Sequence, residues 1–357
     1  MKVLFVVDSL SYGGAGRVVS ILASQLAEMG FEISIAIMGQ DVNRTQEIYA
    51  VDYRVNRFYI NEFGKVTSWK TNIKFLRYCL KKFKPDICIP FLNMYAEYAV
   101  IACLFSNIKV VACERNDPHY SPEAKIYRLL RNPLYSLADK VICQTQDMVD
   151  YFPKHIRNKS RIILNPINTS LPEPYVGKRE KRIVAVGKLG KQKNFSMAID
   201  SFALIQSDIR EYCLEIYGEG TLRAELEKQI EDAGLSNRVF LMGQSDNLFN
   251  DIKSAELFIM TSDYEGMSNA LIEAMALGLP CISTNHPIGG AKTLIENGIN
   301  GVLVPVNDAK EMANAIKKVI NDPVTAKRMS ENAVKIRDRL SIENIAQQWK
   351  QLLLELT

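Results

Sequence analysis

Residues 1–38 carry the pattern that decides the fold, MKVLFVVDSLSYGGAGRVVSILASQLAEMGFEISIAIM. An apolar run at residues 3–7 precedes an amphipathic stretch at 16–29 and a second apolar run at 33–38. Strand, helix and strand in this order form a βαβ unit, in which a helix connects two parallel strands. Parallel sheets are covered by helices on both faces, so this stretch predicts an α/β protein.

The same alternation continues along the chain. In the first half, further strands are expected at residues 87–90, 110–113, 141–144 and 161–164. The pattern lapses in a turn-rich, proline-containing segment at 165–182. It then restarts, and strands are expected at residues 183–186, 214–217, 239–242, 257–260, 280–283 and 301–304. We therefore predict two Rossmann-like, doubly wound parallel-sheet domains that face each other across a cleft.

The domain boundaries follow from this pattern. We expect an N-terminal domain at residues 1–168 and a C-terminal domain at 169–340. The last segment, 341–357, has Ile345, Trp349 and Leu352 at helical spacing. It predicts a closing helix with one buried face, which packs back toward the N-terminal domain.

Composition excludes several classes of protein. The chain has 357 residues, of which 47% are hydrophobic and 24% charged, an ordinary globular composition. Its net charge of +4 is too small to indicate a nucleic-acid partner. No apolar stretch reaches the ~18 residues of a membrane span, and Asp8 interrupts the first run before it could form a signal-peptide core, so we expect a cytoplasmic protein. The seven cysteines are scattered, which predicts buried thiols and no zinc site.

A glycine cluster follows the first strand, at Gly13, Gly14 and Gly16. Glycines at the start of a helix let a ligand approach backbone N–H groups. The cluster is not a nicotinamide-dinucleotide fingerprint, because Val19 stands where the third glycine belongs. The alternative is a tight turn that binds no ligand.

A polar cluster, Glu114, Arg115 and Asn116, follows the strand expected at 110–113. Loops at the carboxyl ends of parallel strands form ligand sites, so we expect these side chains to point into the cleft. The alternative is a salt-bridged surface loop.

In the second half, a basic loop follows the strand expected at 183–186. It contains Gly187, Lys188 and Lys193 just before a helix, and lysines beside a helix N-terminus suit a diphosphate. A solvated basic turn is the alternative. Gly218 and Gly243 follow the next two strands, where a flat ligand could lie against the backbone.

The most informative segment is residues 263–273, which follows the strand expected at 257–260. It places Glu265 in a loop and Glu273 eight positions later on a helix. A carboxylate accepts hydrogen bonds from adjacent hydroxyl groups, as on ribose or a hexose, and the helix N-terminus suits a phosphate. The alternative is that Glu265 is a turn residue and Glu273 a surface residue of the helix.

Taken together, these motifs resemble those of the retaining glycosyltransferases of family 4, which have the two-domain GT-B architecture. The resemblance spans nearly the whole chain. Its motifs are Gly13-Gly14-Ala15-Gly16-Arg17, Glu114-Arg115-Asn116-Asp117-Pro118, Asn165-Pro166-Ile167, Gly187-Lys188-Leu189 with Lys193-Asn194, Gly218-Glu219-Gly220, and the segment from Glu265 to Glu273. Three positions depart from the usual pattern: Gly16 replaces a glutamate, Lys188 stands where arginine is more common, and Arg115 stands where some members have a histidine.

The resemblance implies roles for the site residues. Lys188 and Lys193 would hold the donor diphosphate, and Glu265 would contact the donor sugar near its anomeric carbon, so these three are the candidate catalytic residues. Glu273 would take the nucleotide ribose. Other donor-binding positions implied are Gly14, Gly187, Gly218, Gly243, Gly266, Met267, Ser268 and Asn269. Glu114, Arg115 and Asn116 would face the acceptor or the cleft.

The implied activity is transfer of a hexosyl-type residue from a nucleotide sugar, with a UDP-sugar favoured, to a glycan or lipid-linked glycan in polysaccharide, lipopolysaccharide or capsule biosynthesis. The resemblance favours a front-face displacement that retains the anomeric configuration. The sequence contains no Asp-x-Asp motif and no metal-ligand spacing, so we expect no metal and no cofactor beyond the nucleotide-sugar co-substrate. Two alternatives stay open: an epimerase or hydrolase of the same architecture, and a dinucleotide-dependent oxidoreductase.

Charge is distributed unevenly along the chain. Residues 1–165 carry a net charge of +7 and residues 166–357 a net charge of −3. Two basic amphipathic segments, at 70–84 and 125–134, suggest that the N-terminal domain contacts an anionic membrane surface, on the inner face of the cytoplasmic membrane. The alternative is a pair of outer helices with a solvated basic side.

Overall fold

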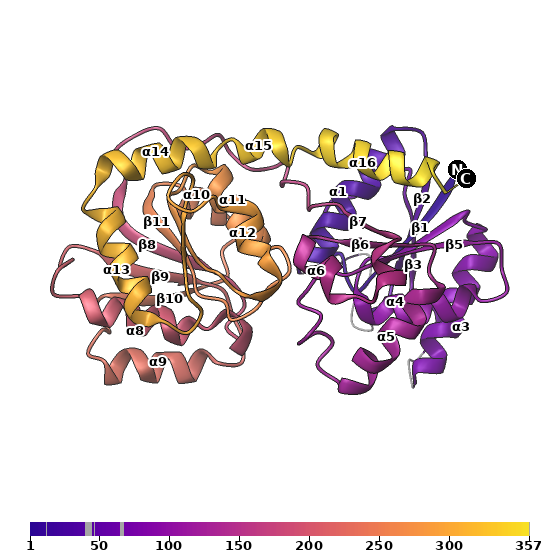
Figure 1. The fold of residues 1–357 in the computed structure, drawn as a ribbon, viewed down its shortest axis with the longest axis horizontal. Coiled ribbons are helices and arrows are strands. Elements are labelled where there is room, and N and C mark those ends of the chain that lie inside the picture. The colour runs from indigo at the N-terminus through magenta and orange to yellow at the C-terminus, as the bar shows by residue number, and fades with distance from the viewer. Residues whose placement is uncertain (12, 40–44, 46, 65–67, 357) are drawn as a thin grey trace. The chain divides into compact units, whose positions relative to one another are not determined.

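The computed structural model describes residues 1–11, 13–39, 45, 47–64 and 68–356. The chain divides into two compact units. The first unit comprises Met1–Thr169 together with Leu340–Thr357, and the second comprises Ser170–Arg339. Each unit is built around one parallel sheet (Figure 1).

The sheet of the first unit has seven strands in the order β3-β2-β1-β4-β5-β6-β7, and neighbouring strands run parallel. The strands are β1 (Lys2–Val7), β2 (Glu32–Ile37), β3 (Asn56–Tyr59), β4 (Ile87–Pro90), β5 (Lys109–Cys113), β6 (Lys140–Cys143) and β7 (Ser160–Ile162). The helices are α1 (Gly14–Glu28), α2 (Ile60–Phe63), α3 (Trp69–Phe83), α4 (Asn93–Cys103), α5 (Lys125–Leu137), α6 (Gln146–Tyr151), α7 (Lys154–Arg157) and α16 (Ile342–Leu354).

The sheet of the second unit has six strands in the order β10-β9-β8-β11-β12-β13, again with parallel neighbours. The strands are β8 (Glu180–Val186), β9 (Cys213–Tyr217), β10 (Val239–Gly243), β11 (Ala255–Met260), β12 (Cys281–Thr284) and β13 (Val302–Val304). The helices are α8 (Phe195–Ile205), α9 (Arg223–Asp232), α10 (Leu248–Ile252), α11 (Asn269–Ala276), α12 (Gly290–Leu294), α13 (Ala309–Ile320), α14 (Pro323–Ala333) and α15 (Ile336–Arg339), with 3₁₀ turns at Lys191–Lys193 and Pro287–Gly289.

Both units have their first strand in the middle of the sheet, from which the chain winds outward in both directions. The prediction of two doubly wound α/β domains is therefore confirmed. The expected strands match observed ones to within one or two residues, except that β8 begins three residues before the expected start at 183 and that β3 was not predicted. β3 lies at the sheet edge and contains Asn56 and Arg57, so it lacks the apolar run of a central strand.

The closing helix α16 packs in the first unit. Trp349, which is fully buried, has its ring centroid 6.4 Å from that of Phe5 on β1 and 6.3 Å from that of Phe91, which directly follows β4. α16 also packs against α1. The core of this unit is therefore completed by a segment at the far end of the sequence.

Gly16 shows why α1 begins as it does. A Cβ atom at this position would lie 2.0 Å from the backbone oxygen of Ser9, so the first turn of α1 approaches the preceding loop too closely for any side chain. This close approach requires glycine at position 16. In the described part of the chain, no helix combines the length and apolarity needed to cross a bilayer.

Candidate active site

The second unit brings two loops together at the carboxyl edge of its sheet. One follows β8 and contains Gly187, Lys188 and the 3₁₀ turn Lys191–Lys193, and the other follows β11 and leads into α11. Because β8 and β11 are adjacent in the sheet, the loops meet. Asp263 N donates to Gln192 O at 2.9 Å, and Asn194 Nδ2 donates to Asp263 Oδ1 at 2.7 Å. These bonds fix the basic loop against the acidic one.

Lys193 and Glu265, each singled out from its own motif, form an ion pair at the meeting point of these loops. Lys193 Nζ lies 2.5 Å from Glu265 Oε1, and the side chains are only 17% and 11% exposed. Ser262 Oγ donates to the same carboxylate oxygen at 3.3 Å. The charges are therefore held at a largely buried position, where Coulomb interactions are stronger than in water.

Lys188, by contrast, is exposed, and no hydrogen bond or ion pair of its side chain is found among the described residues. Gly187 lies under the Lys193 side chain, since a Cβ atom at Gly187 would come 2.8 Å from Lys193 Cε. Glycine at this position lets the lysine lie against the backbone on its way to Glu265. Of the lysines in this loop, Lys193 is paired, whereas Lys188 and Lys191 are exposed.

Gly218 and Gly243 have a structural explanation. Gly218 has φ +141°, and a Cβ atom there would lie 1.9 Å from Gly187 O. Gly218 N also donates to Gly243 O at 2.7 Å. The glycines after β8, β9 and β10 therefore allow three loops to pack backbone against backbone, a requirement that exists without any ligand.

The loop Gly266, Met267 and Ser268 and the helix α11 that follows are largely buried. Ser268 is the N-cap residue of α11, and Asn269 is its first residue. The Ser268 hydroxyl is buried and has no hydrogen-bond partner among the described residues. Glu273 is only 6% exposed, which is unusual for a glutamate on a helix and excludes the surface-residue interpretation. A buried carboxylate and an unpartnered hydroxyl beside a helix N-terminus suit a polar ligand.

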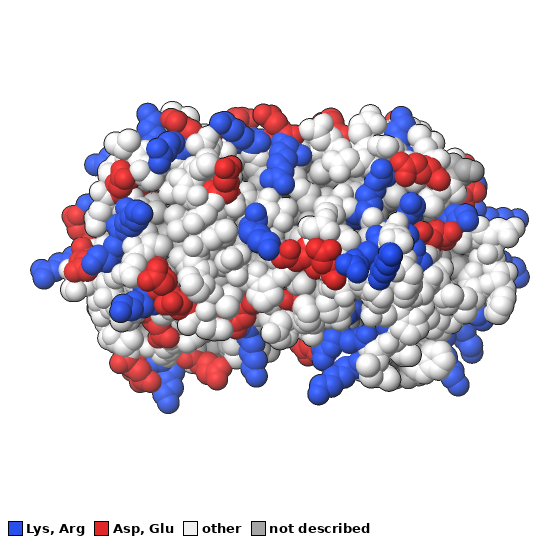
Figure 2. Space-filling model, in the orientation of Figure 1, with Lys and Arg blue, Asp and Glu red and all other residues white. Residues whose placement is uncertain are grey.

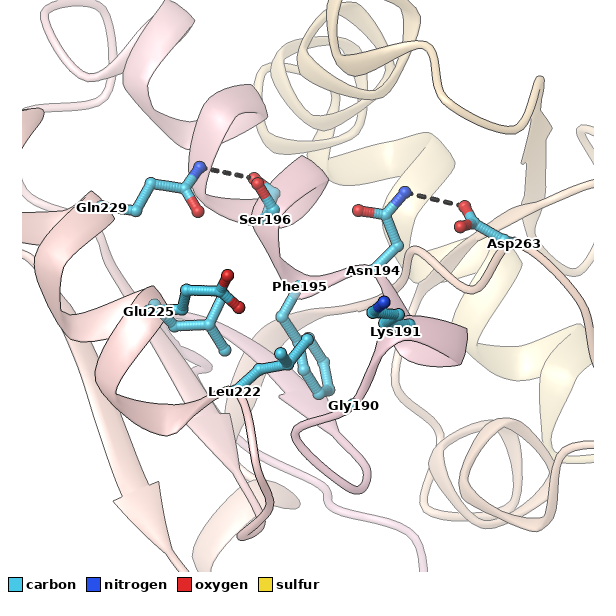
Figure 3. Close-up of a pocket in the computed structure, with 10 residues that line it drawn as sticks. Gly190, Lys191, Asn194, Phe195, Ser196, Leu222, Glu225, Gln229 and Asp263 are labelled. Carbon is cyan, nitrogen blue, oxygen red and sulfur yellow. Dashed lines mark hydrogen bonds between the residues drawn. The ribbon is translucent and has the colours of Figure 1, made fainter.

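A cavity of about 490 Å³ lies beside the basic loop, on the side of α8 and α9 (Figure 3). Lys191, Asn194 and Asp263 line it, whereas Lys193, Glu265 and Glu273 do not. The cavity therefore borders the candidate site without containing its predicted catalytic residues.

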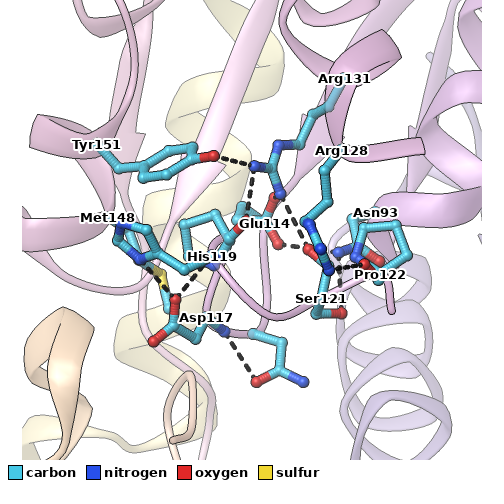
Figure 4. A network of polar contacts seen from close by, with 12 residues as sticks. Asn93, Glu114, Asp117, His119, Ser121, Pro122, Arg128, Arg131, Met148 and Tyr151 are labelled. Atoms are coloured by element: carbon cyan, nitrogen blue, oxygen red, sulfur yellow. Dashed lines mark hydrogen bonds and ion pairs between the residues drawn. The ribbon is translucent and has the colours of Figure 1, made fainter. Parts of the chain in front are cut away.

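In the first unit, the predicted cluster after β5 differs from expectation. Glu114 is fully buried; it accepts from Asn93 Nδ2 at 3.2 Å and lies 3.4 Å from Arg131 Nη1 (Figure 4). Burial raises the pKa of Glu114 to about 7, and Arg131 partly offsets this effect. Glu114 thus belongs to an internal salt-bridged network and not to a surface loop.

Arg115 and Asn116 are half-buried. The guanidinium of Arg115 lies 4.1 Å from the ring centroid of Phe91 and 5.7 Å from that of Trp349, and Nη1 donates to Ile163 O at 3.3 Å. Asn116 Oδ1 accepts from Asp117 N at 2.8 Å, which shapes the turn. Arg115 is therefore held by packing as well as by hydrogen bonds. Gly14 lies at the exposed start of α1, with Gly13 in the positive-φ conformation (φ +80°) before it.

The sequence analysis missed the role of Arg131. Helical periodicity placed this residue on a basic, outward side of the segment 125–134, but it is fully buried. It donates to Pro118 O at 2.8 Å, Ser121 O at 3.0 Å and the Tyr151 hydroxyl at 2.6 Å. Arg131 thus fixes the loop after β5 through hydrogen bonds to its backbone carbonyl groups. Nothing local in the sequence indicates this, because the carbonyl groups it binds belong to a loop ten or more residues earlier.

A second feature of this loop is the pair of Asp117 and His119. His119 Nδ1 lies 2.9 Å from Asp117 Oδ1, and the aspartate is fully buried whereas the imidazole is exposed. The same aspartate oxygen accepts from His119 N at 2.8 Å. The arrangement fixes the orientation of the ring at the surface of the first unit.

Two Rossmann-like domains define the fold class, and the solved structures that resemble the chain share it. HepE from Anabaena, determined with UDP and glucose, has 20% sequence identity and a TM-score of 0.83, with 99% of this chain and 100% of that chain covered. TarM from S. aureus has 15% identity and also a TM-score of 0.83, over 98% and 99% of the two chains. The architecture is the GT-B fold, as predicted.

Family models and curated relatives specify the class further. Residues 12–171 match the model "Glycosyltransferase Family 4", and residues 170–336 match "Glycosyl transferases group 1". A Campylobacter jejuni N-acetylgalactosaminyltransferase, named for an undecaprenol-diphosphate-linked glycan, is 27% identical over 370 residues, covering 99% of each chain. An uncharacterised glycosyltransferase of Haemophilus influenzae is 24% identical over 98% of each chain. The chain belongs to glycosyltransferase family 4 and is a glycosyltransferase.

Proposed function

We propose that the chain transfers a hexosyl-type residue from a nucleotide sugar, with UDP as the favoured nucleotide, to a glycan or lipid-linked glycan acceptor, with retention of anomeric configuration. The observation that carries the proposal is the meeting of Lys193 and Glu265 beside the buried Glu273 and the unpartnered Ser268 hydroxyl. Cations for a diphosphate and carboxylates for hydroxyl groups thus occur at one edge of one sheet.

The donor is assigned to the second unit. Lys188 and Lys193 hold the diphosphate, Glu273 accepts from the ribose hydroxyls, and Glu265 accepts from the sugar. The backbone N–H groups at the start of α11 (Gly266, Met267, Ser268 and Asn269) face the sugar or phosphate. In this scheme Gly187, Gly218 and Gly243 shape the site by close backbone packing rather than by binding the ligand.

The reaction proposed is a front-face displacement. The bond between the anomeric carbon and the phosphate oxygen breaks, the acceptor oxygen bonds to the same face of that carbon, and the acceptor proton passes to the departing phosphate. The lysines stabilise the negative charge that develops on the leaving group. The described residues contain no group of three or more His, Cys, Asp or Glu side chains placed to hold a metal ion, and no step of the scheme runs through one.

The acceptor is assigned to the first unit. The names of two relatives support a cell-surface or lipid-linked glycan. One is the undecaprenol-linked enzyme of C. jejuni, and the other is a Bacillus subtilis poly(glycerol-phosphate) α-glucosyltransferase, 28% identical over 227 residues, which is 62% of this chain and 33% of that protein. We place the reaction in bacterial polysaccharide, lipopolysaccharide or capsule biosynthesis.

Binding and turnover test this function. UDP, GDP and ADP are compared for their ability to raise the melting temperature, since a ligand bound only by the folded state stabilises it. UDP is expected to give the largest shift. Nucleotide release from UDP-sugars is then followed with and without a lipid-linked glycan acceptor. Release that needs no acceptor identifies a hydrolase or epimerase instead, and no shift with any nucleotide refutes the donor assignment.

We propose an anionic membrane surface as a second partner. The exposed basic side chains of α3 support it as expected, whereas on α5 the exposed side chains are mainly apolar rather than basic. On α3, Lys70, Lys74, Arg77, Lys81 and Lys82 are exposed, and Figure 2 shows basic side chains along the edge of the first unit where Figure 1 places this helix. On α5, however, Arg128 and Arg131 turn toward the protein, and Ile126, Leu129, Leu130 and Leu137 are exposed. α4 packs against both helices. A cationic helix and an apolar one on the same side of a sheet fit an anionic bilayer.

Flotation with anionic phosphatidylglycerol vesicles at physiological salt tests this surface. Leu129, which is 72% exposed, is replaced by glutamate, and Leu204, 59% exposed on α8 of the second unit, receives the same change as the control. We expect L129E to lose vesicle binding and L204E to keep it. Wild-type protein that stays with the soluble fraction would remove the membrane from the proposal.

A further inference from the structure

The ion pair of Lys193 and Glu265 joins two residues to which the proposed function gives different ligands. The lysine is assigned to the diphosphate and the glutamate to the sugar, yet the structure places their charged atoms 2.5 Å apart. A diphosphate bound at Lys193 would bring a second anion to an ammonium group that already has one. Like charges repel more strongly where water is largely excluded, so the carboxylate and the diphosphate compete for this lysine.

The contacts show which of the two residues is free to move. The aliphatic part of Lys193 lies against Gly187, and its backbone oxygen accepts from Thr261 Oγ1 at 2.9 Å. The backbone of Lys193 is thus held by a hydrogen bond, and its side chain packs against Gly187. Glu265 belongs to the loop before α11, and its carboxylate also accepts from the Ser262 hydroxyl, at the longer distance of 3.3 Å. An exchange of partners therefore moves the glutamate rather than the lysine.

We propose that Glu265 is a positioning residue for Lys193, which holds the ammonium group as a counter-anion until a nucleoside diphosphate takes it over. This inference rests on the proposed function. Binding of the donor releases the carboxylate, which then accepts hydrogen bonds from the sugar hydroxyls. The same glutamate therefore serves first as the partner of the lysine and then as a ligand of the sugar.

The exchange also affects the release of product. A nucleoside diphosphate carries an ionisable terminal phosphate that is esterified in the nucleotide sugar, so the product is more negative than the donor and is attracted more strongly to Lys193. Once the sugar has left, Glu265 has lost its second partner and returns to the lysine. The return of the carboxylate opposes the extra attraction and helps the nucleotide to dissociate.

The test is the affinity for UDP without a sugar, measured by isothermal titration calorimetry. Glu265→Gln keeps the shape of the side chain but removes its charge, and Glu265→Ala serves as a second variant. If the carboxylate competes with the diphosphate, both variants bind UDP about tenfold more tightly than wild type, as expected for a charged hydrogen bond that no longer has to be broken. In a Lys193→Ala background, Glu265→Gln leaves the affinity for UDP unchanged, because the carboxylate and the diphosphate no longer compete for an ammonium group.

A matched control is Glu211→Gln. Glu211 pairs with Lys181 in the same unit and its loss changes the net charge equally, but it is exposed and belongs to no proposed site. The affinity of the Glu211→Gln variant for UDP should equal that of wild type. UDP affinity that is unchanged or weakened in both Glu265 variants overturns the exchange. Failure of wild type to bind UDP, GDP or ADP would instead refute the donor site itself, so the two ideas fail by different results.

Discussion

Glu97 provides a test of the internal network of the first unit. It lies on α4, is only 3% exposed, and has its pKa raised from 4.5 to about 7, mainly because burial disfavours the ionised form. Since the folded-state pKa lies above the unfolded-state value, the folded state binds the proton more tightly. The contribution of protonated Glu97 to the free energy of unfolding is complete below about pH 4.5 and is lost as the pH rises through about 7.

The size of the effect follows from the same values. At about 1.4 kcal/mol per pH unit, the difference between 4.5 and about 7 amounts to roughly 3 kcal/mol for Glu97. Glu97→Gln removes the group that must be ionised inside the protein. The variant should therefore match wild type near pH 4 and exceed its free energy of unfolding by roughly 3 kcal/mol at pH 8. Glu114, whose pKa is also about 7, keeps part of the pH dependence in the variant.

Tryptophan fluorescence reports on the unfolding of the first unit. The chain has two tryptophans, Trp69 and Trp349, and both belong to the first unit. Urea unfolding followed by their emission between pH 4 and 8 therefore gives the stability of the unit that contains Glu97. Glu123→Gln, at an exposed loop position, is the control and should track wild type at every pH. A gap between Glu97→Gln and wild type that does not widen with pH would refute the reasoning.

Three further changes test other parts of the structure. Lys193→Ala should lower kcat by about 10²- to 10³-fold because charge on the leaving diphosphate loses its partner; steady-state kinetics with a melting curve as control check this, and near-normal turnover would contradict it. Trp349→Ala should destabilise the first unit by about 3–5 kcal/mol, because it leaves a cavity between α16, Phe5 and Phe91. Urea unfolding followed by circular dichroism measures this change, and a loss below about 1 kcal/mol would show that α16 contributes little to stability. Arg131→Met should lower the free energy of unfolding by about 3–5 kcal/mol, because it leaves Glu114 buried without a cation. Adding Glu114→Gln should restore much of this stability, and additive losses in the double variant would argue against the pair.

Much of the fold could be predicted because its central strands are buried on both faces. Such strands read as continuous apolar runs, as residues 3–7 do in β1, and they are recognisable without any knowledge of their neighbours. The edge strand β3 has no such run, since one side of an edge strand needs no partner, and it was missed.

The sequence predicts the residues of the candidate site one by one but not their arrangement. Lys193 and Glu265 were each identified from their own motif, but their ion pair depends on β8 lying beside β11, a matter of strand order. Arg131 could not be assigned at all. Helical periodicity gives the spacing of side chains around α5 but not the direction in which the helix faces, and here the apolar side faces outward because the arginines satisfy loop carbonyls.

The position of α16 has a consequence for biosynthesis. Phe5 and Phe91 emerge from the ribosome well before Trp349, which packs on both and is made about 260 residues after Phe91. At translation rates of about 5–20 residues per second, the nascent first unit waits on the order of ten seconds or more for its final helix. During that interval the contacts of Phe5 and Phe91 with Trp349 are absent, and Arg115 lacks one of the two rings on which it rests.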